Sequence, residues 1–265
     1  MGIVNTDIGF IGTGGIATAL ARGFCGSEDF VGKVYVYDIN VERIRALKAL
    51  FGEKIVIAAS NQDLLYEAEA VFPALRPEVL REVAPTLAFR PANRVIHIAA
   101  GIRLSEARQW YAGAQSVVRA VPLPFASRRM GPVVLYGDDD VCRDILSLMG
   151  DVVKVPEEKH LDILSSVTAL MVPYFELVAE TGEWCAANGM DRKDAIDYVC
   201  LMNGALSRLM MADCGGDVDG FMRENTTPGG LNEFALGFLR ESGAYAPWAK
   251  ALDQVYERFY HERPA

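Results

Sequence analysis

The sequence predicts an α/β protein in which a doubly wound, mostly parallel sheet precedes a second domain made only of helices. Three observations lead to this fold class. Short apolar runs alternate with helical patterns over residues 1–155. Beyond Pro156 the strand-like runs stop, and long helical patterns take their place. A glycine-rich turn also joins the first apolar run to the first helical pattern.

The apolar runs of the first part are interpreted as β-strands because they are short and bounded by turn residues. They lie at residues 7–11, 33–37, 55–58, 70–74, 94–99, 117–120 and 132–136. Helical spacing of apolar residues covers 15–24, 41–51, 63–68, 77–87 and 105–111. Strands separated by helices pair in parallel, and unbroken apolar runs are typical of a sheet that is covered on both faces.

The second part of the chain shows only helical spacing, over residues 160–188, 191–211, 231–242 and 247–263. Gly189 predicts a helix end, because glycine readily adopts the left-handed conformation that follows a helix. Asp191 predicts the next helix start, because aspartate accepts backbone hydrogen bonds at an N-cap. We therefore expect two domains, residues 1–155 and residues 156–265.

Composition and charge exclude several classes of protein. The 265 residues are 51% apolar with a net charge of −9, so a globular chain without a nucleic-acid partner is expected. The five cysteines and three histidines are scattered, which predicts no metal site and favours reduced thiols in a cytoplasm. The apolar stretch 167–175 is far shorter than the ~20 residues of a membrane span, so we expect a soluble protein without membrane contact.

The glycine-rich turn predicts a dinucleotide site of the Rossmann type. The segment Gly12-Thr13-Gly14-Gly15-Ile16-Ala17 has the pattern G-x-G-x-x-A between a strand and a helix. In that pattern the first glycine makes the tight turn and the second lets the backbone approach a pyrophosphate. The helix N-terminus then presents free N–H groups to the phosphates.

Asp38 ends the second predicted strand, where Rossmann domains carry an acid that hydrogen-bonds the adenosine ribose. Such an acid repels a 2′-phosphate, so NAD(H) is slightly favoured over NADP(H). Two alternatives stay open. Asp38 would serve only to cap a turn, or Arg43 would reach across and hold a 2′-phosphate.

Motifs along nearly the whole chain resemble one enzyme family. They are Gly9–Ala17, Asn61, Phe72–Pro77, Ile98–Ile102, Arg119–Pro122, Thr168–Leu170 and Thr226–Gly230. The sequence is similar in these segments to the pyrroline-5-carboxylate reductases, the last enzymes of proline biosynthesis. Thr-Thr-Pro-Gly-Gly at 226–230 is the most specific of these motifs outside the glycine turn.

The resemblance implies an NAD(P)H-dependent reductase that transfers hydride to the C=N carbon of a small cyclic imine. It places Asn61 near the adenosine end of the cofactor, Ala74 and Leu75 at the ribose, and Ala99, Ala100 and Gly101 under the nicotinamide. The remaining cofactor contacts are expected from Gly12, Thr13, Gly14, Gly15, Ile16 and Asp38. It also implies a homodimer or larger assembly that forms through the helical domain.

The candidate substrate residues depart from the family pattern. Leu123-Pro-Phe stands where the family has Asn-Thr-Pro, and Met171-Val-Pro replaces Gly-Ser-Gly-Pro. Leu231 and Asn232 replace two threonines that lie at the imine and carboxylate of the substrate. We expect Asn232 and Thr227 as catalytic residues, and substrate contacts from Pro122, Leu123, Tyr174, Gly229, Gly230 and Leu231. The cofactor half thus matches the family more closely than the substrate half.

Two other functions stay open at this point. A hydroxyacid or prephenate-type NAD(P) dehydrogenase would share the glycine turn. A catalytically inactive nucleotide-binding protein would explain the loss of the substrate threonines. Glu233 is also ambiguous, because it would either pair with a substrate cation or complement the dipole of the helix that it begins. His97 is expected to be a core or strand-surface residue rather than a catalytic acid.

Overall fold

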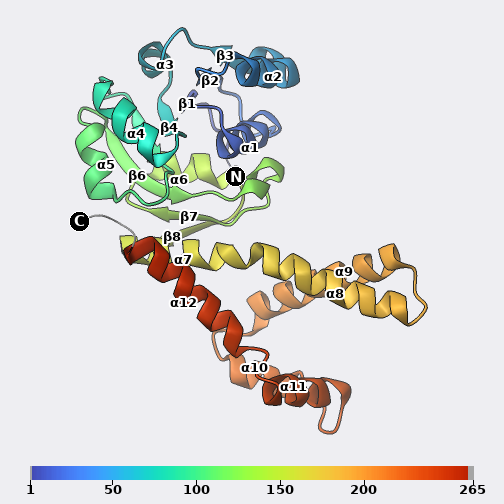
Figure 1. The fold of residues 1–265 in the computed structure, drawn as a ribbon. Coiled ribbons are helices and arrows are strands. Elements are labelled where there is room, and N and C mark those ends of the chain that lie inside the picture. The colour runs from blue at the N-terminus through green and yellow to red at the C-terminus, as the bar shows by residue number, and fades with distance from the viewer. Residues whose placement is uncertain (1, 262–265) are drawn as a thin grey trace. The chain divides into compact units, whose positions relative to one another are not determined.

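The computed structural model describes residues 2–261. The chain forms two compact units that divide between Ser165 and Ser166, inside one helix (Figure 1). The first unit is a mixed α/β domain, and the second is helical throughout the part that the structure describes. The predicted fold class is confirmed.

The first unit is built on one eight-stranded sheet with the order β3-β2-β1-β4-β5-β6-β7-β8. Its strands are β1 (Ile8–Ile11), β2 (Val34–Tyr37), β3 (Ile55–Ile57), β4 (Ala70–Pro73), β5 (Arg94–His97), β6 (Ser116–Val121), β7 (Val133–Tyr136) and β8 (Val152–Val155). Strands β1 to β6 are parallel, β7 runs antiparallel to β6, and β8 is parallel to β7. The strand order reverses between β1 and β4, which is where doubly wound sheets bind their ligands.

Helices cover both faces of this sheet. They are α1 (Gly15–Cys25), α2 (Val41–Phe51), α3 (Asn61–Glu67), α4 (Pro77–Val83), α5 (Leu104–Trp110), α6 (Asp140–Ser147) and the start of α7 (Glu158–Val167). One apolar cluster joins α1, α2 and α6 to the sheet and contains the stacked rings of Phe10 and Phe72, whose centroids are 5.0 Å apart. A second cluster contains side chains of α3, α4 and α5. Helices α4 and α5 lie side by side (Figure 1) and are linked by an Arg81–Glu106 ion pair.

Two elements of the first unit were not predicted from the sequence. Strand β8 carries the exposed Val153 and Lys154 at the sheet edge, so its apolar pattern is too weak to distinguish it from a loop. Helix α6 begins within the acidic segment 138–140. Asp139 caps α6 by accepting the N–H of Cys142, and it also pairs with Arg94.

The second unit contains α8 (Met171–Ala187), α9 (Arg192–Asp213), α10 (Val218–Glu224), α11 (Leu231–Glu241) and α12 (Ala246–His261). A 3-10 turn, Thr168–Leu170, separates α7 from α8 within the predicted helix 160–188. Asp191 caps α9 through the N–H groups of Lys193 and Asp194, as predicted. Helix α10 was not predicted, and the predicted end of the last helix at Arg263 lies outside the described residues.

Helices α8 and α9 pack closely at Gly182. A Cβ atom there would lie 2.7 Å from Cγ1 of Ile196, so only glycine allows this approach. The unit nevertheless buries few of its apolar side chains by itself. Exposed examples on α8, α9 and α11 include Phe175, Trp184, Leu201, Met211, Phe234 and Phe238.

One helical stretch, residues 158–187, is long and apolar enough to span a membrane by length and composition alone. No membrane span was expected, because the apolar stretch 167–175 is far shorter than the ~20 residues of a span. The stretch contains the 3-10 turn between α7 and α8. Its first two turns carry Glu158 and Asp162, which pair with Arg119 inside the first unit. Exposed apolar residues such as those of this stretch are typical of surfaces that bind either another protein or a membrane.

Candidate active site

The turn between β1 and α1 requires glycine at its first position. Gly12 has φ +91°, which lies in the left-handed region. A Cβ at Gly12 would also lie 2.7 Å from Cδ2 of Leu75 and 3.0 Å from the carbonyl oxygen of Ala74. The turn after β1 is therefore pressed against the segment that follows β4, and both lie at the carboxyl ends of parallel strands.

The N-terminus of α1 is open to an anion. Gly14 is its N-cap and offers no side chain to the first N–H groups, and the first turn of α1 contains no acid. A Cβ built on Gly15 meets no atom within 4 Å, so the space beside the first turn is free of protein. Exposed N–H groups and the positive end of the helix dipole fit the pyrophosphate of a dinucleotide.

Asp38 follows β2 and is tied to the glycine turn. Its Oδ2 accepts hydrogen bonds from the backbone N–H of Thr13 at 2.6 Å and from Oγ1 of Thr13 at 2.8 Å. Its Oδ1 accepts the N–H of Asn40 at 2.8 Å, so Asp38 does cap a turn, while Asn40 caps α2. A carboxylate offers about four acceptor positions, which leaves room for a ribose hydroxyl.

These contacts keep Asp38 ionised. Partial burial opposes the charge, but hydrogen bonds from Asn40 and Thr13 outweigh burial and lower the pKa of the carboxyl. The charge of Arg43 acts in the same direction. A negative charge therefore lies beside the turn, with the exposed Arg43 near enough to influence it.

The other candidate cofactor residues follow neighbouring strands. The N–H of Ala74 donates to the carbonyl of Ile11 at 2.8 Å, which joins the ends of β4 and β1. Ala99 shares a buried cluster with Ile11, and Gly101 turns the chain after β5 with φ +77°. Asn61 begins α3, and its buried Oδ1 accepts no hydrogen bond from the described residues. The residues present thus fit a dinucleotide at this edge.

His97 lies at the end of β5 and is fully buried. Its Nδ1 lies 3.2 Å from the hydroxyl of Tyr111. Burial, with the charge of Arg119 adding to it, lowers the pKa of His97 to about 3. The imidazole is therefore neutral at physiological pH, so it does not supply an acidic proton from this position.

The candidate substrate residues are divided between the two units. Pro122 and Leu123 follow β6 in the first unit, whereas Tyr174 lies on α8 and is partly exposed. Thr227, Gly229 and Gly230 form the turn before α11, and Leu231 and Asn232 begin that helix with exposed side chains.

Glu233 has a local partner in this turn. Its Oε2 accepts the N–H of Gly229 at 2.6 Å, and the N–H of Gly230 donates to the carbonyl of Thr227 at 2.9 Å. Gly229 itself has φ +72°. Glu233 therefore stabilises the Pro-Gly-Gly turn, and the N–H of Gly229 is already used.

A buried charge cluster on β6 was not predicted from the sequence. Nη1 of Arg119 donates to Oε1 of Glu158 at 2.7 Å, and Nη2 donates to Oδ1 of Asp162 at 2.9 Å. Glu158 Oε1 also accepts the N–H of Leu104 at 2.7 Å. The side chains of Arg119 and Asp162 are only 4% and 7% exposed. The sequence places Glu158 and Asp162 four residues apart on a helix, which puts both acids on one face. It does not indicate that Arg119 is their partner, because Arg119 is 39 residues or more away.

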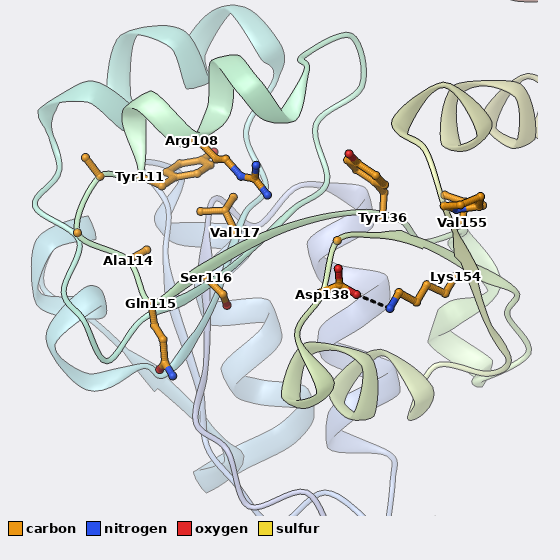
Figure 2. Close-up of a pocket in the computed structure, with 14 residues that line it drawn as sticks. Arg108, Tyr111, Ala114, Gln115, Ser116, Val117, Tyr136, Asp138, Lys154 and Val155 are labelled. Carbon is orange, nitrogen blue, oxygen red and sulfur yellow. Dashed lines mark hydrogen bonds and ion pairs between the residues drawn. The ribbon is translucent and has the colours of Figure 1, made fainter.

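A cavity of about 880 Å³ lies away from the glycine turn (Figure 2). It is lined by Arg108 of α5, the segment 111–115 that follows α5, the start of β6 and the ends of β7 and β8. The ion pair between Asp138 and Lys154 forms part of its wall. None of the candidate cofactor or substrate residues lines this cavity. Among residues 2–261, no group of three or more potential metal ligands was found.

Comparison with known proteins finds similarity to the same enzyme family that the sequence motifs resemble. A family model described as NADP oxidoreductase, coenzyme F420-dependent, matches residues 7–101. Over 266 residues, the chain is 26% identical to pyrroline-5-carboxylate reductase of Pseudomonas aeruginosa, covering 95% of this chain and 94% of that protein. The chain is similar over nearly its whole length to pyrroline-5-carboxylate reductases. The likeness spans both units.

Solved structures of pyrroline-5-carboxylate reductases have the same fold. The 1-pyrroline-5-carboxylate reductase of Streptococcus pyogenes aligns with a TM-score of 0.81 at 20% identity, covering 96% of this chain and 98% of that one. The pyrroline carboxylate reductase of Plasmodium falciparum, solved with NADP bound, aligns with a TM-score of 0.75 at 18% identity, covering 97% and 98%. At these identities the structural matches establish the fold.

Proposed function

We propose that this chain is an NAD(P)H-dependent reductase of a small cyclic imine, 1-pyrroline-5-carboxylate or a related compound. The observation that carries the proposal is the similarity to pyrroline-5-carboxylate reductases, which extends from the glycine turn through the Pro-Gly-Gly turn. The open N-terminus of α1 and the ionised Asp38 supply the features that a dinucleotide needs. A hydroxyacid-type dehydrogenase remains the runner-up.

The chain's own residues then have the following roles. A bound nicotinamide supplies the hydride, and the segment Ala99–Gly101 positions it at the edge of the sheet. The free N–H groups of the first turn of α11 hold a substrate carboxylate. Asn232 donates a hydrogen bond to the substrate where related enzymes use threonine, and Thr227 lies at the other side of the same turn. The exposed Leu231 makes the pocket more apolar than a pair of threonines would.

We propose a preference for NAD(H). The charge of Asp38 lies where the 2′-phosphate of NADP(H) would approach, so binding of NADP(H) incurs a like-charge contact. Arg43 is the residue that would offset this repulsion, because its charge already acts on Asp38.

We also propose that the protein is a cytoplasmic homodimer or larger homo-oligomer, assembled through the second unit. The exposed apolar side chains of α8, α9 and α11 support this, since isolated soluble proteins rarely leave so many large apolar residues uncovered.

The decisive experiment measures consumption of NADH and NADPH with a panel of cyclic imines that includes 1-pyrroline-5-carboxylate. Turnover of at least one imine is expected. Gly12→Ala is expected to abolish nucleotide binding, because φ +91° and the contact with Ala74 exclude a side chain. Gly237→Ala is the matched control, since a Cβ there meets no atom within 4 Å. Tight nucleotide binding without turnover of any imine would favour the inactive nucleotide-binding protein.

A further inference from the structure

Glu158 links the start of α7 to the start of α5. Glu158 and Asp162 both lie on α7, and both bind the guanidinium of Arg119. Only Glu158 also accepts the N–H of Leu104, the first residue of α5. This contact joins segments that are 54 residues apart in the sequence.

The hydrogen bond to Leu104 fixes the end of the loop 98–103. This loop connects β5 to α5, and it contains Ala99, Ala100 and Gly101. Ala99 and Ile102 are buried, whereas Ala100 is exposed and Gly101 has no atom within 4 Å of its Cβ position. The middle of the loop therefore has few contacts, and its position depends on the anchors at its two ends.

We propose that Glu158 is a positioning residue for the loop 98–103, held in place for that role by Arg119. The proposal rests on the proposed function, in which this loop lies under the nicotinamide. Arg119 orients the Glu158 carboxylate from β6, and Glu158 holds the backbone of Leu104. Loss of the contact lets the loop move, and hydride transfer falls because it requires close alignment of donor and acceptor carbons.

Two alanine variants separate positioning from anchoring of α7. Glu158→Ala and Asp162→Ala each remove one carboxylate from a cluster of one cation and two anions. Each leaves Arg119 with one partner, so the charge change is the same. Only Glu158→Ala releases the N–H of Leu104. Glu158→Gln provides the rescue, because its amide oxygen is still able to accept that N–H.

The first measurement is backbone hydrogen exchange over residues 98–104, without nucleotide or substrate. Glu158→Ala is expected to speed exchange there about tenfold, since an opening equilibrium shifts tenfold when one hydrogen bond of this kind is lost. Asp162→Ala and Glu158→Gln are expected to stay near the wild-type rate. Equal acceleration in both alanine variants, or none in Glu158→Ala, would overturn the proposal.

The second measurement is steady-state imine reduction. Glu158→Ala is expected to lower kcat about tenfold, with KM and NADH affinity within about twofold of wild type. Asp162→Ala is expected to keep at least half of kcat. A loss of NADH affinity equal to the loss of kcat would count against positioning. If the exchange pattern holds but the wild type reduces no imine, the loop assignment stands and the proposed function fails.

Discussion

At the scale of single residues, the decisive features are polar contacts that fix backbone segments. Asp38 holds the glycine turn through Thr13, Glu233 holds the Pro-Gly-Gly turn through Gly229, and Arg119 organises two acids of α7. Each of these side chains acts on the backbone or on another side chain of the protein. Their effects are therefore measurable as changes in affinity or stability.

Nucleotide preference depends on Asp38. NADH is expected to bind at least about tenfold more tightly than NADPH, because the 2′-phosphate approaches a carboxylate whose pKa is lowered. Asp38→Ser is expected to remove most of this difference. Fluorescence titration with both nucleotides measures it, with Asp63→Ser on α3 as the control. Tighter binding of NADPH by the wild type would contradict the prediction and assign the 2′-phosphate to Arg43.

The buried His97 makes stability depend on pH. Its folded-state pKa is about 3 and its ordinary value is 6.5, so between these values the unfolded chain binds more protons. Stability is expected to fall as pH drops from 6.5 toward 3, by at most about 1.4 kcal/mol per pH unit from this residue.

The comparison variant is His97→Gln, with stability measured by urea unfolding at several pH values. Below pH 6.5, the free energy of unfolding of the variant is expected to fall less steeply with decreasing pH than that of wild type. The difference corresponds to the uptake of up to one proton on unfolding. An unchanged slope would show that His97 titrates alike in the folded and unfolded chains.

At the scale of elements, helix starts carry the candidate chemistry. The first turn of α1 contains no acid and has open space beside Gly15, as a phosphate site requires. The first turn of α11 presents Leu231 and Asn232 to solvent and has Glu233 folded back onto Gly229. The two helix starts differ because α1 begins with glycine at Gly14 and Gly15, whereas α11 begins with the side chains of Leu231 and Asn232.

Asn232 at the start of α11 is expected to act on the substrate alone. Asn232→Ala should lower turnover about tenfold or more and leave NADH affinity nearly unchanged, because a lost substrate hydrogen bond costs roughly 1–3 kcal/mol. Gln254→Ala removes an exposed amide from α12 and is the control.

The same helix start predicts the substrate. Without the two threonines, activity on 1-pyrroline-5-carboxylate is expected to be weak, and a bulkier or less polar imine should react better. Steady-state rates on the imine panel decide both points. Normal rates for Asn232→Ala, or high efficiency on 1-pyrroline-5-carboxylate, would place the substrate elsewhere.

At the scale of the whole molecule, the two units differ in how completely they bury apolar residues. The first unit has apolar clusters on both sheet faces. By contrast, α8 and α9 together bury only Val178, Gly182, Ala195 and Val199. A helical unit of this kind gains stability when its apolar surface is covered. This is the physical ground for expecting an assembly.

A matched pair of variants tests the assembly. Leu201 on α9 and Ile3 in the first unit are both 72% exposed. Leu201→Glu is expected to weaken the oligomer strongly, because a buried unpaired charge at an interface is costly, whereas Ile3→Glu should not. Light scattering reports the mass of each variant. A stable wild-type monomer at micromolar concentration would contradict the prediction, and wild type that requires detergent would assign the apolar face to a membrane.

The sequence by itself determined the features that depend on neighbouring residues. The strand–turn–helix at Gly12, the alternation that builds a doubly wound sheet, and the cap at Asp191 all follow from spacing and local backbone preference. These patterns also predicted most helices and strands, because burial of one face imposes a period on the residues that form it. Edge strand β8 was missed because an edge imposes a weaker pattern.

Only the tertiary structure decided which distant residues meet. It placed Thr13 against Asp38, and Leu104 and Arg119 against Glu158, across separations of 25, 54 and 39 residues. It also showed that the carboxylate of Glu233 accepts the N–H of Gly229 and is not free. No periodicity encodes such pairs. They form when packing brings chain segments together and each polar group that loses water must find a partner among the groups that the fold places within reach.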